Sequence, residues 1–142
     1  MDFADAVAIA ARAYGDRRDR AGVLLIAHAV EVAQALGGSA MLTAMNTAVL
    51  HDVVEDTDWS TDDLHNRGVD PLVCEAVEVL TRRSGETYMG HIDRIRAEPG
   101  LAGDTARVVK VADLKVNFAR ADSDALRERY ERSLPLVQSA LV

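Results

Sequence analysis

The chain has 142 residues, of which 49% are hydrophobic and 27% charged, a composition that suits one folded domain and argues against disorder. Its net charge of −7 disfavours binding to polymeric nucleic acid, because such binding needs a basic surface. The acidic start and the absence of an apolar run of ~18–20 residues argue against a signal peptide and a membrane-bound protein, so we expect a cytoplasmic location.

Helical patterns follow one another along the whole chain. Aromatic residues make up only 4%, and the many Ala, Val and Leu residues favour helix packing over a sandwich or barrel. Apolar residues at helical spacing predict helices over residues 3–14, 23–36, 40–56, 61–66, 71–83, 87–97, 104–118 and from 124 onward. We therefore predict an all-α fold, a single compact bundle of six to eight helices.

Several helix ends carry recognisable signals. Ser39 and Asp104 are expected as N-terminal caps, and Ser60 with Asp63 resembles a capping box. Asp70 followed by Pro71 marks another start, since proline is favoured at the first helical position. Pro135 should kink or divide the last helix, because it removes a backbone donor.

An acidic cluster lies near the end of the predicted helix 40–56. His51 is followed by Asp52, Glu55, Asp56 and Asp58. Negative charge at a helix C-terminus is unfavourable by roughly 0.3–1 kcal/mol per group. A bound cation would reverse this cost.

Two further polar residues interrupt apolar runs. His28 lies within residues 24–30 and Asp113 within residues 108–114. An unpaired carboxylate at a buried position is costly, so Asp113 requires a cation or strong donors. With His51 and Asp52 these residues make a mixed nitrogen and oxygen set that suits manganese, iron(II), zinc or cobalt. In six-coordinate geometry such a set leaves about two positions for water or a phosphate oxygen, as hydrolysis requires.

The order of these residues resembles a known family. His28, then His51-Asp52, then Asp113 match the H…HD…D signature of HD-domain phosphohydrolases, and residues 51–57 resemble the HDxxED segment of RelA/SpoT hydrolase domains and small alarmone hydrolases. Residues 111–117, which end in Asn117, resemble the second-ligand motif of that group, and residues 80–83 also match its small members. The similarity covers residues 20–117 and implies that residues 1–142 form one HD-type domain.

The resemblance also implies roles for individual residues. In that family the metal is usually manganese, and the Glu-Asp pair, here Glu55 and Asp56, positions the attacking water and handles its proton. Family members remove pyrophosphate from the 3′ position of guanosine tetra- or pentaphosphate or act on related small phosphorylated nucleotides, and the asparagine equivalent to Asn117 contacts the nucleotide. We expect Arg20, Lys110 and Arg107 to neutralise the phosphates.

The chain also departs from the alarmone hydrolase pattern. Asp19 occupies the position of an arginine that stacks on guanine, and Arg20 is the remaining basic residue. Leu24-Leu25 replaces the usual Pro-Tyr pair, and Ala29 replaces the proline after the first ligand. The ligand pattern is therefore retained while the guanine-binding segment differs.

Other readings of single residues stay open. Glu55 and Asp56 could be solvated residues at a helix end, and Asn117 could bridge helices. His65 and His91 match no ligand position and are interpreted as surface residues, and Tyr88 as a packing residue with a solvated hydroxyl.

Three other functions compete with alarmone hydrolysis. A 5′-nucleotidase or another nucleotide pyrophosphohydrolase would use the same metal site. A nucleotide-sensing module would bind without turnover, which the altered segment 19–29 favours and the Glu55-Asp56 pair disfavours. A structural helical subunit would bind no metal.

Overall fold

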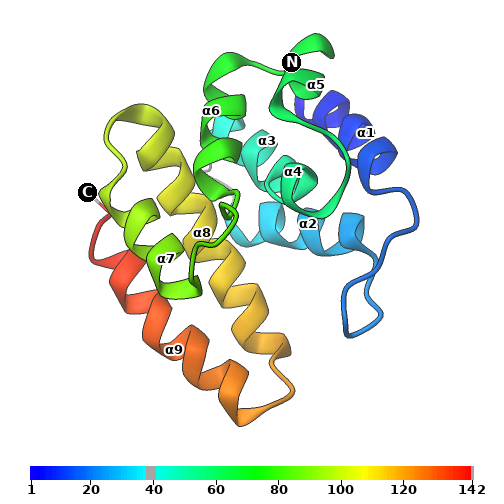
Figure 1. Ribbon diagram of the computed structural model, residues 1–142. Coiled ribbons are helices and arrows are strands. Elements are labelled where there is room, and N and C mark those ends of the chain that lie inside the picture. The colour runs from blue at the N-terminus through cyan, green and yellow to red at the C-terminus, as the bar shows by residue number, and fades with distance from the viewer. Residues whose placement is uncertain (38–40, 142) are drawn as a thin grey trace.

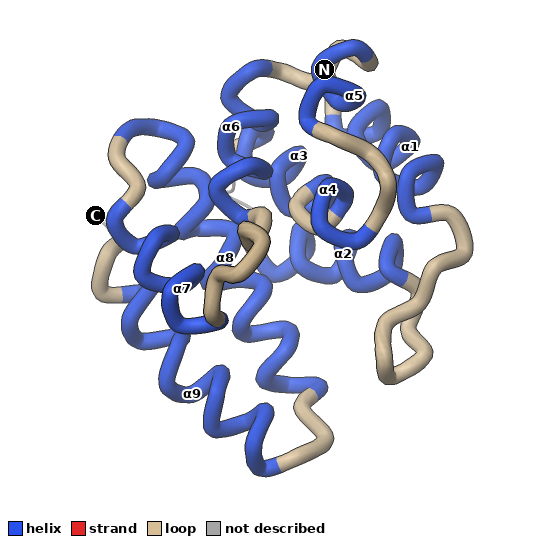
Figure 2. The backbone as a smooth tube through the Cα atoms, in the orientation of Figure 1, coloured by secondary structure: helices blue, strands red, loops and turns tan. Residues whose placement is uncertain are grey.

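The computed structural model describes residues 1–37 and 41–141, and within them it contains nine helical segments and no strand (Figures 1 and 2). The segments are α1 (Phe3–Tyr14), α2 (Leu25–Ala35), α3 (Leu42–Leu50), α4 (Val53–Asp56), α5 (Thr61–Asn66), α6 (Pro71–Leu80), α7 (Tyr88–Ala97), α8 (Gly100–Arg120) and α9 (Asp124–Gln138). The all-α prediction is confirmed. α3 and α4 together occupy the single helix predicted over residues 40–56, so the nine segments correspond to eight predicted helices.

The helix predicted over residues 40–56 is interrupted at His51 and Asp52. α3 ends at Leu50, and α4 begins only at Val53. Between them Asp52 has φ −100° and ψ 1°, outside the helical range. Apolar spacing does not reveal this break, since His51-Asp52 fits the same periodicity. The predicted cap Ser39 lies outside the described residues.

Most predicted helix ends are confirmed, and two are wrong. Ser60 and Asp63 form the reciprocal capping box at α5. Asp104 does not cap α8, which begins one turn earlier after Pro99, so the Asp104 carboxylate binds Arg107 within the helix. Pro135 does not divide α9, because the helix continues to Gln138.

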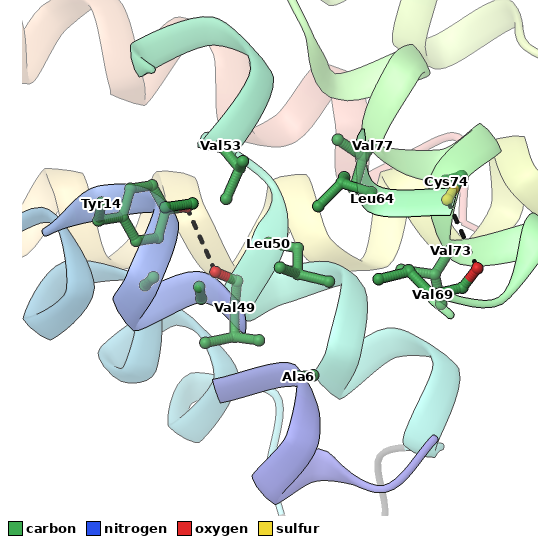
Figure 3. Close-up of a cluster of buried hydrophobic side chains, with 13 residues drawn as sticks. Ala6, Tyr14, Val49, Leu50, Val53, Leu64, Val69, Val73, Cys74 and Val77 are labelled. Atoms are coloured by element: carbon green, nitrogen blue, oxygen red, sulfur yellow. Dashed lines mark hydrogen bonds between the residues drawn. The ribbon is translucent and has the colours of Figure 1, made fainter. Parts of the chain in front are cut away.

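Helix α8 is the central element of the bundle and packs against α2, α3, α6, α7 and α9 (Figure 1). Its buried apolar residues include Ala106, Val109 and Ala112, which repeat every three residues along one face. A second apolar cluster joins α1, α3, α5 and α6 around Leu50, Leu64 and Val77 (Figure 3). In the part of the chain that is described, no helix is both long and apolar enough to cross a membrane.

Candidate metal centre

Three helices bring the predicted ligands together. His28 lies on α2, His51 follows the last residue of α3, and Asp113 lies on α8. His28 Nε2 is 3.1 Å and His51 Nε2 is 3.4 Å from the same oxygen, Asp113 Oδ1. One ligand atom from each residue lies within 4.8 Å of the other two, and all three residues are buried. This cluster could hold a divalent metal ion.

Asp52 adjoins the cluster but lies at its edge. Its Oδ2 is 3.1 Å from His51 Nε2, and a quarter of its side chain is exposed. The mutual group of three does not include Asp52. The carboxylate of Asp52 therefore lies between the buried ligands and the open side of the site.

The tautomer of His51 suits metal binding. Its Nδ1 lies 2.6 Å from the carbonyl oxygen of Ala48, and since a carbonyl can only accept, Nδ1 must carry the proton and donate it. Nε2 is buried and has no hydrogen-bond partner among the described residues. Nε2 faces two carboxylates, so this nitrogen and both acids are stabilised together when a cation, either a proton or a metal ion, binds there.

The electrostatics of the cluster favour positive charge. Burial lowers the pKa of His51, but the negative charges of Asp52 and Asp113 outweigh it and raise this pKa well above its usual range. The potential that would hold a proton there would also hold a metal ion. The donor set therefore fits a divalent cation of intermediate softness, and His28, His51, Asp52 and Asp113 are the residues that could bind it.

Lys110 lies directly behind Asp113 on α8. Its Nζ donates a hydrogen bond to Asp113 Oδ2 over 3.1 Å, which leaves Oδ1 to the two histidines. Burial lowers the pKa of Lys110, but Asp113 opposes this effect and the net direction is upward, so the lysine stays charged. Burial raises the pKa of Asp113, while Lys110 and the histidines lower it more strongly, so Asp113 remains a carboxylate.

A cleft of about 640 Å³ opens beside the cluster. Three of the predicted ligands line it, namely His28, Asp52 and Asp113, whereas His51 does not. The other lining residues include Arg20, Glu55, Asp56, Lys110 and Asn117. A second cavity of about 510 Å³, between α6, α7 and α8, contains none of them. The cleft thus brings these side chains together, and their functional roles stay predictions.

Glu55 and Asp56 differ in how they are held. Glu55 Oε1 accepts the backbone N–H of Arg82 over 2.7 Å, which ties α4 to the loop after α6. Burial, together with Asp52 and Glu55, raises the pKa of Asp56 to about 7. Without a bound metal, Asp56 would therefore exchange a proton near neutral pH.

Three residues of the cleft were missed by the sequence reasoning. Arg120 ends α8, and Arg129 and Tyr130 lie on α9. The Arg129 guanidinium lies 4.4 Å from the centre of the Tyr88 ring, and Arg120 pairs with Glu31 of α2. The sequence of α9 carries no motif, and its charged residues are typical of a solvated helix, so no local signal could have found Arg129 and Tyr130.

Three expectations about single residues are wrong. Arg107 does not reach the cleft, because it is buried and donates to the carbonyl oxygens of Ile95 and Glu98. His91 is buried rather than at the surface, with Nε2 3.1 Å from the carbonyl oxygen of Leu80. The Tyr88 hydroxyl is buried and has no partner within the described residues.

The arrangement of helices also occurs in a protein of known structure. The same fold occurs in a metazoan ortholog of SpoT, a protein that hydrolyses ppGpp and plays a role in starvation responses. The two structures agree with a TM-score of 0.75 and 22% sequence identity, over 97% of this chain and 84% of the other. No protein-family model and no curated protein sequence matches the chain. The likeness establishes the fold, as the resemblance to the RelA/SpoT group predicted.

Proposed function

We propose that the protein is a metal-dependent phosphohydrolase that acts on a small phosphorylated nucleotide, with a guanosine polyphosphate as the first candidate substrate. The observation that carries this proposal is the convergence of His28, His51 and Asp113 within 4.8 Å, next to a cleft that also contains Glu55 and Asp56. The fold shared with a protein that hydrolyses ppGpp supports the choice of substrate class.

The metal would be held by His28, His51, Asp52 and Asp113. A divalent cation supplies Lewis-acid polarisation of a phosphoryl oxygen and of water. Manganese is the expected ion, and iron(II), zinc or cobalt also suit this donor set. Lys110 keeps Asp113 ionised and oriented, so that one carboxylate oxygen stays available on the cluster side.

Glu55 and Asp56 would act on the attacking water. Because Arg82 N–H holds Glu55 Oε1, the other oxygen of Glu55 is left to orient a water molecule in the cleft. Asp56 accepts the proton as the water oxygen attacks phosphorus and the bond from phosphorus to the ester oxygen breaks. The departing oxygen then takes up a proton, so the step yields an alcohol and a free phosphate or pyrophosphate.

The cleft offers positive charge for several phosphate groups. Lys110 lies beside the ligand cluster, and Arg20, Arg120 and Arg129 line the cleft farther out. Charge-assisted hydrogen bonds from such groups are the usual means of binding phosphates. Asn117 lies one helical turn after Asp113, so its amide can bind the nucleotide next to the reacting phosphate.

The loop between α1 and α2 would bind the base differently from a typical alarmone hydrolase. Asp19 Oδ1 accepts the backbone N–H groups of Ala21 and Val23, over 2.9 and 3.0 Å. Asp19 therefore stabilises the turn that carries Arg20, and it offers no cationic plane for stacking on a base. This difference favours the second candidate function, a 5′-nucleotidase or other nucleotide pyrophosphohydrolase on the same metal site.

A substrate screen with added manganese tests the proposal. We expect release of phosphate or pyrophosphate from at least one guanosine polyphosphate, and little release by the Glu55→Gln variant. Dephosphorylation of nucleoside monophosphates alone would favour the second candidate. Tight nucleotide binding without any product would instead identify a sensing module and contradict the hydrolase proposal.

A further inference from the structure

The interruption between α3 and α4 changes which backbone groups are paired. In an unbroken α-helix, the N–H of Asp52 would donate to the carbonyl oxygen of Ala48, four residues earlier. Here that carbonyl accepts the Nδ1–H of His51 over 2.6 Å. Asp52 therefore needs another acceptor, because a buried N–H without a partner is costly.

Tyr14 of α1 supplies this acceptor. The Asp52 N–H donates to the Tyr14 hydroxyl oxygen over 3.2 Å. The hydroxyl donates in turn to the carbonyl oxygen of Val49 over 3.3 Å, as Figure 3 shows. One hydroxyl group from a distant helix thus joins both sides of the interruption. The Tyr14 side chain is fully buried, so packing sets the position of that hydroxyl.

We propose that Tyr14 is a positioning residue for the metal centre. By binding the Asp52 N–H, it leaves the Ala48 carbonyl free for Nδ1–H of His51 and so directs His51 Nε2 toward Asp113. This inference rests on the proposed function in one respect, the role of His51 as a metal ligand. The hydrogen-bond relay itself does not depend on any substrate.

A purely structural role for Tyr14 makes a different prediction. A buried tyrosine that only fills space would lose stability on Tyr14→Phe but leave the tautomer of His51 unchanged. In the relay, loss of the hydroxyl returns Asp52 N–H to Ala48 and removes the acceptor that fixes Nδ1–H. The tautomer and the metal affinity of the folded protein therefore distinguish the two roles.

The experiment compares Tyr14→Phe with Thr47→Val in the full chain. Thr47 is an equally buried residue of α3 whose hydroxyl donates to the carbonyl oxygen of Thr43, within the same helix. We measure the protonated nitrogen of His51 by ¹⁵N NMR without metal, at a pH above the raised pKa of His51, and the affinity for Mn²⁺ by titration. We expect Tyr14→Phe to shift the tautomer mixture and weaken Mn²⁺ binding by about 10-fold or more, as losses behind a metal ligand do. Thr47→Val should change neither.

The outcomes separate this inference from the proposed function. If the unaltered protein binds no Mn²⁺, the proposed function fails, and the tautomer comparison still decides the role of Tyr14. An Nδ1-protonated His51 and unchanged affinity in Tyr14→Phe would overturn the inference. If Tyr14→Phe does not fold, NMR of the Tyr14 hydroxyl proton in the unaltered protein tests the relay instead. A Tyr14 hydroxyl proton with a nuclear Overhauser effect to the Asp52 amide supports the relay, and a hydroxyl in fast exchange with water overturns it.

Discussion

The ligand cluster (His28, His51 and Asp113) and the outer part of the cleft, called the rim here and represented by Arg20 and Arg129, differ in burial and in their place in the fold. His28, His51 and Asp113 are 9%, 3% and 4% exposed, and each lies on a helix of the core or directly after one. Arg20 and Arg129 are exposed and come from a loop and from the peripheral helix α9. Core packing therefore determines the geometry of the ligands, while the rim can vary with little effect on them. We therefore expect substitutions in the cluster to affect metal binding and turnover, and substitutions at the rim to affect substrate binding.

The largest expected effect is the loss of metal by His51→Ala. This change removes an imidazole whose Nε2 faces both Asp52 and Asp113, and it leaves those carboxylates close together without a shared donor. We expect no retained metal and no turnover, measured by elemental analysis and a phosphate-release assay. His65→Ala, at an exposed histidine of α5, is the matched control and should keep both. Full metal content in His51→Ala would break the distinction between cluster and rim.

The next effect separates metal binding from proton handling. Glu55→Gln preserves an oxygen that can accept Arg82 N–H but removes the negative charge. We expect turnover to fall about 100-fold or more, as for loss of a general base, with the metal content unchanged. Glu75→Gln, at an exposed position of α6, provides the control. Equal metal loss in Glu55→Gln and His51→Ala would refute these assigned roles.

The rim should respond through substrate binding. Arg129→Ala removes a cleft guanidinium that stacks on Tyr88, and we expect KM to rise about 10-fold with the Mn²⁺ affinity unchanged. The control is Arg132→Ala on the same helix, since Arg132 is exposed and pairs with Glu128. A change in kcat without a change in KM would place Arg129 with the catalytic groups instead.

The smallest effect on activity is expected at His91, which supports the loop after α6. Burial, together with Lys110 and Arg94, lowers the pKa of His91 to about 4. In the unfolded chain His91 binds a proton below about pH 6.5, whereas in the folded protein it stays neutral down to about pH 4. This contribution to stability is therefore complete above pH 6.5 and is lost as the pH falls toward 4.

Denaturant unfolding at several pH values measures this contribution. Between pH 7 and pH 5 the free energy of unfolding should fall by about 2 kcal/mol because of His91. In His91→Gln the dependence should be flatter by that amount, while Mn²⁺ affinity at pH 7 stays the same. An identical pH dependence in both proteins would contradict a neutral, buried His91.

The helices and the candidate ligands are predicted from the sequence for different physical reasons. Helical spacing of apolar residues and explicit caps such as Ser60 are local signals, so most element bounds agree with the structure. His28 and Asp113 could be identified because a polar residue in an apolar run must find a partner. The break at His51-Asp52 has no local signal, since it depends on the hydroxyl of Tyr14 from another helix.

The errors share the same origin. His91 lies in a polar stretch, yet it is buried and its Nε2 lies against the carbonyl oxygen of Leu80 at the end of α6. Arg107 was expected near phosphates from its place on α8, but it lies on the face that binds the end of α7. The rim residue Arg129 is likewise brought to the cleft only by the packing of α9 against α8. Contacts between distant segments cannot be read from spacing.

Anomalous diffraction from crystals grown with manganese can locate the proposed metal ion. We expect one strong peak, within coordinating distance of His28 Nε2, His51 Nε2, Asp113 Oδ1 and a carboxylate oxygen of Asp52. A manganese peak away from these four side chains, or an ordered site with no peak at saturating manganese, would contradict it.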